Sequence, residues 1–245
     1  MTGADIFPTV AASWPPSATQ SVGPFVVPEP DAGGNRVSAA RLNEPTARNA
    51  SEEGLEAAET AMNAQARAPL FQVLDHQDGL SNALDQRGYI ARDHTDILVI
   101  RSADLAAPPP PVTAFTIWPP LAIQTEIWEA GGIDAARRAV MDRADFPKTS
   151  LFGRINDKPA GAAFVGVNGS VAMLHALEIT PSARRAGLAS TMMRAAADWA
   201  QKEGAEWFSV LVTQQNSGAQ RLYASLGLRA VGTYCYREKT GGPTQ

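Results

Sequence analysis

The chain has 245 residues, of which 44% are hydrophobic and 19% charged, so it is long enough for one large domain or two small ones. A formal net charge of -4 argues against a general nucleic-acid binder, because phosphate backbones are bound mainly by clustered Lys and Arg. No apolar run approaches the roughly 20 residues of a membrane helix and the N-terminus lacks the order of a signal peptide, so we expect no membrane partner and a cytoplasmic location. One cysteine, Cys235, and three scattered histidines exclude an internal disulfide and predict no metal site.

The first 105 residues contain patterns for a hairpin, two helices and two strands. Residues 23–42 favour the hairpin, and residues 52–65, EEGLEAAETAMNAQ, favour the first helix. Residues 69–102 follow with the pattern of a strand, a helix that ends at Gly88, and a second strand.

The run AAPPPPV at residues 106–112 cannot be the interior of a helix or of a central strand, because each proline lacks an N–H and fixes its own φ. We interpret it as a stiff linker, with a Pro-rich surface loop inside one domain as the alternative. The linker interpretation predicts an N-terminal domain of residues 1–105, a linker of residues 106–111 and a C-terminal domain of residues 112–245.

The C-terminal half has the clearer periodicity. Residues 121–144 predict two short helices broken at Gly131 and Gly132. Three strands, a helix, a strand, a helix and a terminal strand or two are then expected, at residues 150–157, 159–169, 171–179, 188–204, 207–212, 216–227 and 229–238.

The two halves resemble each other weakly. Residues 69–102 align with the strand, helix, glycine and strand near the C-terminus when Gly88 is matched to Gly227. The hairpin and helix before residue 66 fall where the C-terminal half has its own hairpin and helix. We therefore infer two copies of a related architecture, although one pair of segments can share this pattern by chance.

Arg184 and Arg185 precede Ala186, Gly187 and a helical pattern, immediately after the third strand. A glycine here permits a tight turn and leaves the first helical N–H groups without partners. These groups, the positive end of the helix and two arginines attract an anion, and small neighbouring side chains let a phosphate approach the backbone. A diphosphate is the expected ligand. For this stretch alone, two exposed arginines before an ordinary helix are the alternative.

The spacing of Arg184, Gly187 and Ala189 resembles the acyl-CoA signature Q/R-x-x-G-x-G/A of the GCN5-related N-acetyltransferases (GNAT). The lead-in LEITPSARRAGLA is similar to the family's apolar strand, Val-x-Pro turn and phosphate loop. The later NSGAQRLYASLGL matches the family's Asn, Leu-Tyr and Leu-Gly helix, and the resemblance extends over residues 118–239. The glycine patterns of dinucleotide-binding folds and of P-loop NTPases are absent from the sequence.

The resemblance implies an α/β (α+β) fold of tandem GNAT-like domains, each with a mixed, mostly antiparallel central sheet flanked by helices. It also implies an acyl-CoA-dependent N-acetyltransferase that transfers an acetyl group directly from acetyl-CoA to a primary amine of a small molecule or protein. A non-catalytic acyl-CoA-binding sensor or interaction module is the alternative. The expected assembly is a monomer or a homodimer.

The resemblance assigns a set of residues to acetyl-CoA. The loop and the helix start would bind the diphosphate, the backbone of the third strand would pair with the pantetheine like an added strand, and the Asn that caps the last helix would touch the same arm. These residues are Leu177, Glu178, Ile179, Arg184, Arg185, Ala186, Gly187, Leu188, Ala189, Ser190, Asn216 and Tyr223.

Three side chains are candidates for catalysis. By resemblance, the Tyr223 hydroxyl would face the CoA sulfur as general acid, with a buried core tyrosine as the alternative. Strand alternation places His175 on one face with Met173, Leu177 and Ile179, where its imidazole would accept the amine proton or serve only in packing. Glu178 has the opposite parity and is expected to be a surface charge, but a bulge would turn it inward, so it is the second candidate base.

The N-terminal copy is predicted to lack this chemistry. When Gly54 is aligned with Gly187, Ser51 and Glu52 replace the two arginines and Glu53 replaces Ala186. Acidic side chains would repel a diphosphate. Leu84 stands in the place of Tyr223, so we expect this half to complete the core, shape the acceptor pocket or mimic a subunit.

Overall fold

The computed structural model describes residues 1–239 and has a mixed α/β fold. The helices are α1 (Gly3–Ala12), α2 (Asn35–Ser38), α3 (Glu52–Ala64), α4 (Asp78–Gln86), α5 (Ser102–Leu105), α6 (Ala122–Ala130), α7 (Ala135–Arg143), α8 (Leu188–Lys202) and α9 (Ser217–Ser225), with a 3-10 turn η1 (Pro181–Ala183). The strands are β1 (Thr19–Val22), β2 (Phe25–Pro28), β3 (Arg41–Leu42), β4 (Leu70–Leu74), β5 (Tyr89–Arg101), β6 (Ala114–Ile117), β7 (Lys148–Ile155), β8 (Lys158–Asn168), β9 (Val171–Ile179), β10 (Trp207–Thr213) and β11 (Arg229–Lys239).

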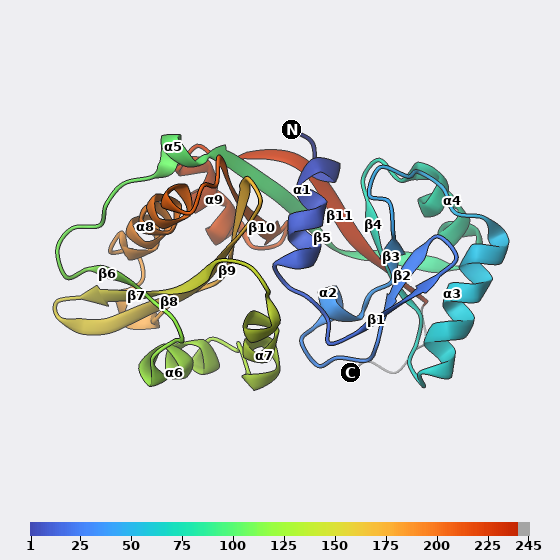
Figure 1. The fold of residues 1–245 in the computed structure, drawn as a ribbon, viewed down its shortest axis with the longest axis horizontal. Helices are drawn as coiled ribbons and strands as arrows, with labels where there is room; N and C mark the ends of the chain where they lie inside the picture. Colours follow the sequence, from blue (N-terminus) through green and yellow to red (C-terminus); the bar gives the residue numbers. More distant parts are fainter. Residues whose placement is uncertain (240–245) are drawn as a thin grey trace.

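The expected fold class is confirmed: a large, mostly antiparallel sheet carries helices in both halves of the chain. The main sheet has eight strands in the order β4-β11-β5-β10-β9-β8-β7-β6, and β1, β2 and β3 form a separate small sheet. Figure 1 shows the C-terminal lobe around α8 and the N-terminal lobe around α3, with α1 between them. Among residues 1–239, no helix has the length and apolar character needed to cross a bilayer.

The C-terminal elements fall where their periodicity predicts. The two-glycine break separates α6 from α7, β7 to β9 form a meander, and α8 begins directly after Gly187. The buried stripe of α8 consists of small and flexible side chains that pack against β7, β8 and β9. This packing fixes the start of α8 beside the end of β9.

Two long strands cross between the lobes. β5 belongs to the N-terminal half but pairs with β10 through Thr95–Arg101, and β11 belongs to the C-terminal half but pairs with β4 through Tyr234–Glu238. β5 and β11 also pair with each other (Figure 1). Each half therefore places a strand inside the other half's part of the sheet.

Side-chain contacts reinforce this exchange. Arg237 of β11 is buried and donates to Asp85 of α4 at 2.8 Å, while Arg101 of β5 pairs with Glu206 at 3.2 Å. The segment at residues 106–113, which contains the proline run, has no helix or strand and leads into β6. The division into residues 1–105, 106–111 and 112–245 stays a prediction.

β9 departs from regular alternation in its middle. Its register with β8 shifts between the pairs Phe164–His175 and Ala162–Glu178, and Ala176 has a φ of 54°. This bulge reverses the side-chain faces of the residues after it.

The bulge corrects one prediction. Leu177 and Ile179 pack on the core beneath α8, whereas Met173 belongs to a core on the opposite face and His175 stacks near Phe164. The expectation that these four residues share a face is wrong, because strict alternation ends at Ala176. The same bulge turns Glu178 to the face of His175.

β9 and β10 separate after a short pairing. Their parallel register covers Val171–Leu174 and Trp207–Val210, and the remaining residues of the two strands are not paired with each other. The second half of β9 is therefore open on the side of β10.

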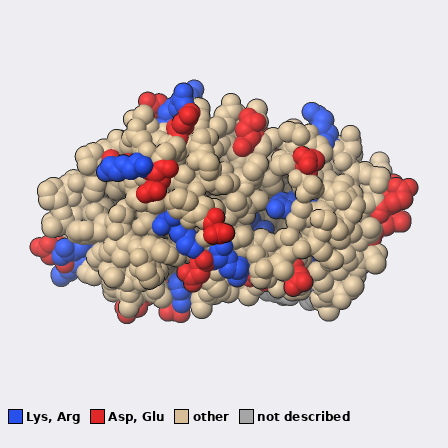
Figure 2. Space-filling view, viewed as in Figure 1, with Lys and Arg blue, Asp and Glu red and all other residues tan. Residues whose placement is uncertain are grey.

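On the face of the molecule in Figure 2, acidic and basic side chains are interspersed among residues without charge. The described part of this face therefore has no extended basic area of the kind that binds phosphate backbones.

Candidate active site

The loop before α8 is open and its backbone groups are available. Gly187 is the residue before the helix, has a φ of 83°, and a Cβ placed there would meet no atom within 4 Å. The first N–H of this helix with an acceptor among residues 1–239 is that of Thr191, which donates to Gly187 O at 3.1 Å. The N–H groups of Leu188, Ala189 and Ser190 are thus free at the positive end of the helix.

Two arginines flank these N–H groups. Arg184 donates from Nε to Ile179 O and from Nη2 to Glu178 Oε1, both at 3.1 Å. Arg185 is exposed, has a φ of 66°, and pairs with no carboxylate among residues 1–239. The loop therefore combines backbone donors and two cations, which is the arrangement that binds a diphosphate.

A cavity of about 480 Å³ lies where β9 and β10 separate. Its lining from the C-terminal half includes His175, Leu177, Leu211 and Tyr223, with contributions from β11. The N-terminal half contributes Trp14, Gly33, Gly34, Asn35, Arg36, Asp93 and Thr95. Because both halves build the wall, the cavity exists only when the two lobes are assembled.

Tyr223 lies on α9 with its ring buried and its side chain in the cavity wall. Its hydroxyl makes no hydrogen bond to the described part of the chain and is not among the atoms sealed from solvent. Burial raises the pKa of Tyr223 to about 12, so the phenol keeps its proton at neutral pH. Such a group can donate a proton but cannot serve as a base there.

His175 is buried and both of its ring nitrogens have partners. Nδ1 lies 3.3 Å from Arg36 Nη1, and Nε2 lies 2.8 Å from Ser13 Oγ. A guanidinium only donates, so Nδ1 is the acceptor and Nε2 carries the proton. Burial, with a smaller effect of the charge on Arg36, holds the pKa of His175 well below its usual range, and the ring is neutral at pH 7.

Glu178 is half-buried at the break between α6 and α7. A Cβ on Gly131 would lie 2.6 Å from Glu178 Cγ, so a larger residue there would displace the Glu178 side chain from its present position. The Glu178 side chain is 20% exposed, and its carboxylate accepts from Arg184. Glu178 therefore connects the bulged strand to the loop before α8.

Asn216 precedes α9 and accepts from the N–H of Ala219 at 3.1 Å, which is the capping bond expected from its position. Leu177 and Ile179 lie along the part of β9 that β10 does not pair, where the Ile179 carbonyl accepts from Arg184 and the backbone of Leu177 is available to an extended ligand. Residues Arg184 to Gly187 precede α8, and Leu188, Ala189 and Ser190 form its first turn. Of the cofactor residues assigned from the sequence, Leu177 and Tyr223 share the cavity lining and Asn216 lies outside it. The contacts of the whole set with acetyl-CoA stay a prediction.

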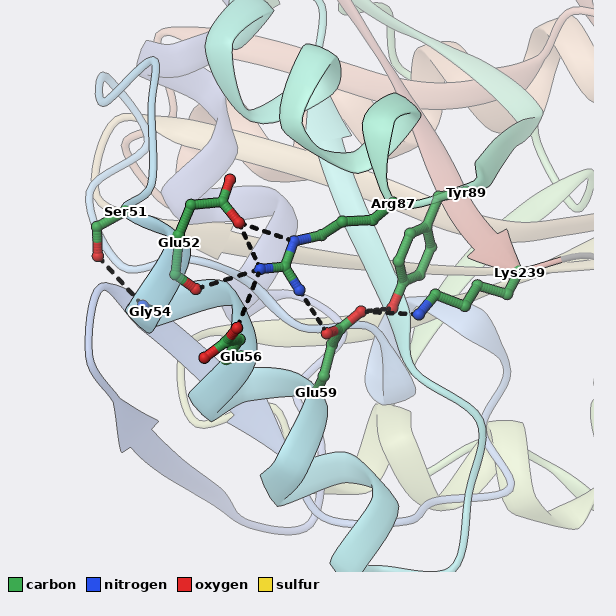
Figure 3. Close-up of polar contacts among 8 residues, drawn as sticks. All are labelled: Ser51, Glu52, Gly54, Glu56, Glu59, Arg87, Tyr89 and Lys239. Carbon is green, nitrogen blue, oxygen red and sulfur yellow. Dashed lines mark hydrogen bonds and ion pairs between the residues drawn. The ribbon is translucent and has the colours of Figure 1, made fainter.

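The corresponding helix start in the N-terminal half is closed. Ser51 Oγ accepts from the N–H of Gly54 at 3.1 Å, and a Cβ on Gly54 would lie 2.8 Å from Pro24 Cδ. Arg87 pairs with the acidic residues Glu52 and Glu59 of α3, as Figure 3 shows. At this helix start the Gly54 N–H is capped, Gly54 lies under a proline ring, and carboxylates stand nearby.

The ion-pair network around Arg87 extends to β11, the C-terminal strand that pairs with β4. Glu59 accepts from Tyr89 Oη at 2.7 Å and pairs with Lys239 of β11 at 3.2 Å (Figure 3). At the position aligned with Tyr223, Leu84 is fully buried in the core of this half. The polar groups of this half thus hold its elements together, as expected for a copy without the chemistry.

The sequence allowed a role for the N-terminal half in shaping a pocket, but it did not identify the residues of that half that line the cavity. Ser13 and Trp14 follow α1, a helix that the periodicity analysis did not identify because Pro8 lies inside it. The capping box between Thr2 and Asp5 is a signal that could have indicated α1. Arg36 gave no signal, because α2 has only four residues.

Comparison with protein families gives one match: residues 117–228 match the acetyltransferase (GNAT) family. A comparison with curated proteins finds no match.

Solved structures resemble the whole chain. A GCN5-related N-acetyltransferase from Kribbella flavida is 20% identical with a TM-score of 0.76, covering 99% of this chain and 97% of that one. A functionally unknown conserved protein from Staphylococcus epidermidis is 9% identical with a TM-score of 0.70, at 95% and 96% coverage. A tandem GNAT protein from the clavulanic acid biosynthesis pathway is 14% identical with a TM-score of 0.62, at 95% and 86% coverage. The N-terminal half therefore shares the GNAT-like fold.

Proposed function

Residues 117–228 form a domain of the acetyltransferase (GNAT) family, and on this premise we propose that the chain is an acyl-CoA-dependent N-acetyltransferase. Members of this family are acyltransferases. The proposed reaction is direct transfer of an acetyl group from acetyl-CoA to a primary amine.

The loop before α8 supports the proposal most directly. Three free helical N–H groups and Arg185 would bind the diphosphate of CoA, while the open edge of β9 would pair with the pantetheine amides. This path leads from the helix start along β9 toward the cavity lined by Tyr223. The thioester would therefore lie beside the phenol.

Transfer in this arrangement needs no covalent enzyme intermediate. The amine nitrogen attacks the thioester carbonyl carbon, and backbone N–H groups of β9 would stabilise the oxyanion. Collapse breaks the C–S bond, and Tyr223 donates its proton to the departing sulfur. The phenolate recovers a proton from solvent, which balances the proton that the attacking nitrogen loses to the base.

For the base, the contacts favour Glu178 over His175. His175 uses Nδ1 as the acceptor of Arg36 and is buried, so it has no free lone pair for an amine. Glu178 faces the same side of β9 and retains exposed surface. We assign proton removal to Glu178, acting through water, with Arg184 holding the carboxylate.

Calorimetric titration with acetyl-CoA tests the proposal. We expect one site per chain with micromolar affinity, followed by release of free thiol when amines are added. Two sites would make the N-terminal half a working copy. Binding without thiol release across a broad amine panel would favour an acyl-CoA sensor, and no binding would overturn the assignment.

A further inference from the structure

The cavity beside Tyr223 carries a positive charge that neither the CoA loop nor the acyl transfer uses. Arg36 from α2 and Arg137 from α7 both line it, one from each half of the chain. Among residues 1–239, neither guanidinium pairs with a carboxylate within 4 Å. In a chain with a net charge of -4, two uncompensated cations in one cavity indicate an anionic ligand group.

Arg36 is held in place by neutral partners. Its Nη1 donates to His175 Nδ1 at 3.3 Å, and its guanidinium carbon lies 5.0 Å from the centroid of the Trp14 ring. His175 is oriented in turn by Ser13 and by the Trp14 ring at 5.1 Å. Among residues 1–239, these contacts use one of the five N–H donors of Arg36, so the guanidinium is held in place while its other donors have no partner in that part of the chain.

The acidic side chain in the cavity lining is already occupied. Asp93 of β5 accepts from Arg92 at 2.9 Å and from Asn35 at 3.4 Å. It does not pair with Arg36 or Arg137 within 4 Å. The lining therefore offers fixed donors for an anion, among apolar and aromatic side chains that suit a small molecule.

We propose that the acceptor is an amine that also carries a carboxylate, as an amino acid does. This inference rests on the proposed acetyl transfer. Arg36 binds the carboxylate through its free N–H groups, Arg137 adds charge from the other lobe, and the amine points to the thioester beside Tyr223. His175 is a positioning residue that holds Arg36, and the N-terminal half selects the acceptor.

The experiment compares matched acceptors that differ only in the carboxylate. Glycine, leucine, phenylalanine, glutamate and lysine are each assayed beside their carboxamides, at saturating acetyl-CoA. We expect kcat/KM to favour the best amino acid over its amide by about 10-fold or more. Arg36→Gln should remove this preference by raising KM for the acid alone, and Arg36→Lys should restore part of it.

Control variants separate this role from general effects on folding. Arg138 lies on α7 beside Arg137 but pairs with Glu129 and does not line the cavity. The variant Arg138→Gln should therefore leave the ratio of kcat/KM for the acid to kcat/KM for the amide unchanged. His175→Gln should raise KM for the acid with little change in kcat, as expected for a residue that acts through Arg36. An unchanged ratio in the Arg36 variants would overturn the proposal.

Product binding gives a readout that does not need turnover. N-acetylated forms of the same amino acids should bind the CoA-loaded protein more tightly than the N-acetylated carboxamides, and Arg36→Gln should abolish the difference. Turnover of amines with no preference for the carboxylate would overturn this inference and leave the transferase assignment intact. Absence of acetyl-CoA binding would instead overturn the transferase assignment.

Discussion

The starts of α3 and α8 occupy equivalent places in the two halves, and both begin near a Gly-Leu pair. At α8 the glycine is exposed, the first N–H groups are free and arginines stand beside them. At α3 the glycine is buried under Pro24, Ser51 caps the helix, and Glu52 and Glu53 occupy the first turn. The two helix starts thus differ in a few residues around the helix end, and this difference is the basis on which we propose an anion site at α8 alone.

The last helices of the two halves show the same contrast. α9 directs Tyr223 to the cavity, whereas α4 directs Leu84 into the core. In the N-terminal half, Leu84 packs in the core and has no hydroxyl group that could donate a proton. The asymmetry predicts that substitutions at the C-terminal positions will affect ligands, and that substitutions at the N-terminal positions will affect only stability.

The largest effect is expected from Gly187→Glu. A carboxylate at the helix start, in the open space beside Gly187, would repel the diphosphate, so acetyl-CoA affinity should fall by at least about 100-fold in calorimetric titration. Gly204→Glu is the matched control, because Gly204 also has a positive φ and open space, at the other end of α8. Both variants carry similar backbone strain, so affinity retained by Gly187→Glu would contradict the diphosphate site.

Tyr223→Phe should lower kcat by about 100-fold, because general acids contribute on this scale. The affinity for acetyl-CoA should change little, since the ring is retained. Because the pKa of Tyr223 is about 12, the wild-type phenol stays protonated and should cause no loss of kcat between pH 8 and 10. Stopped-flow thiol release from pH 8 to 10 measures both kcat of the variant and the pH dependence of kcat in the wild type. An unchanged kcat in the variant would remove Tyr223 from the mechanism.

His175 connects the halves and gives a smaller, pH-dependent effect. Its folded-state pKa lies well below its usual 6.5, so the unfolded chain takes up a proton as pH falls below 6.5 while the folded protein does not. This linkage lowers stability toward acid by up to about 1.4 kcal/mol per pH unit. In His175→Gln, the free energy of unfolding measured in urea should fall less steeply from pH 6.5 to 5; an identical slope would contradict the neutral, buried state.

The smallest effect is expected from an attempt to rebuild the N-terminal site. Ser51→Arg with Glu52→Gln places a cation at α3, but Pro24 still covers Gly54. Loss of the Ser51 cap should cost about 1 kcal/mol of stability, and the stoichiometry of acetyl-CoA should stay at one. A second acetyl-CoA site in the titration would contradict this expectation. It would show that the difference in charge, without the Pro24 cover, explains why only the start of α8 binds acetyl-CoA.

The order of elements in the C-terminal half could be predicted from the sequence, because glycines and alternating strands mark their ends locally. The loop from Arg184 to Ala189 was also recognisable, since backbone donors and cations adjacent in sequence stay adjacent in space. The face of Glu178 was not predictable with certainty, because it depends on a bulge at Ala176 that no residue type demands.

The cavity beside Tyr223 could not be predicted from either half alone. Trp14, Arg36 and Asp93 reach it from separate parts of the N-terminal half, and the first two contact His175 of the C-terminal half. Contacts of this kind depend on tertiary packing between residues more than 100 positions apart. Local sequence patterns do not indicate which distant residues form such pairs.

The crossing of β5 and β11 also has a consequence for biosynthesis. The N-terminal sheet needs β11 between β4 and β5, and β11 ends at Lys239. A ribosome must therefore synthesise β11 before the N-terminal lobe can close its sheet. Nascent chains that stop before residue 229 expose the edges of β4 and β5, so they are the forms that chaperones and proteases should recognise.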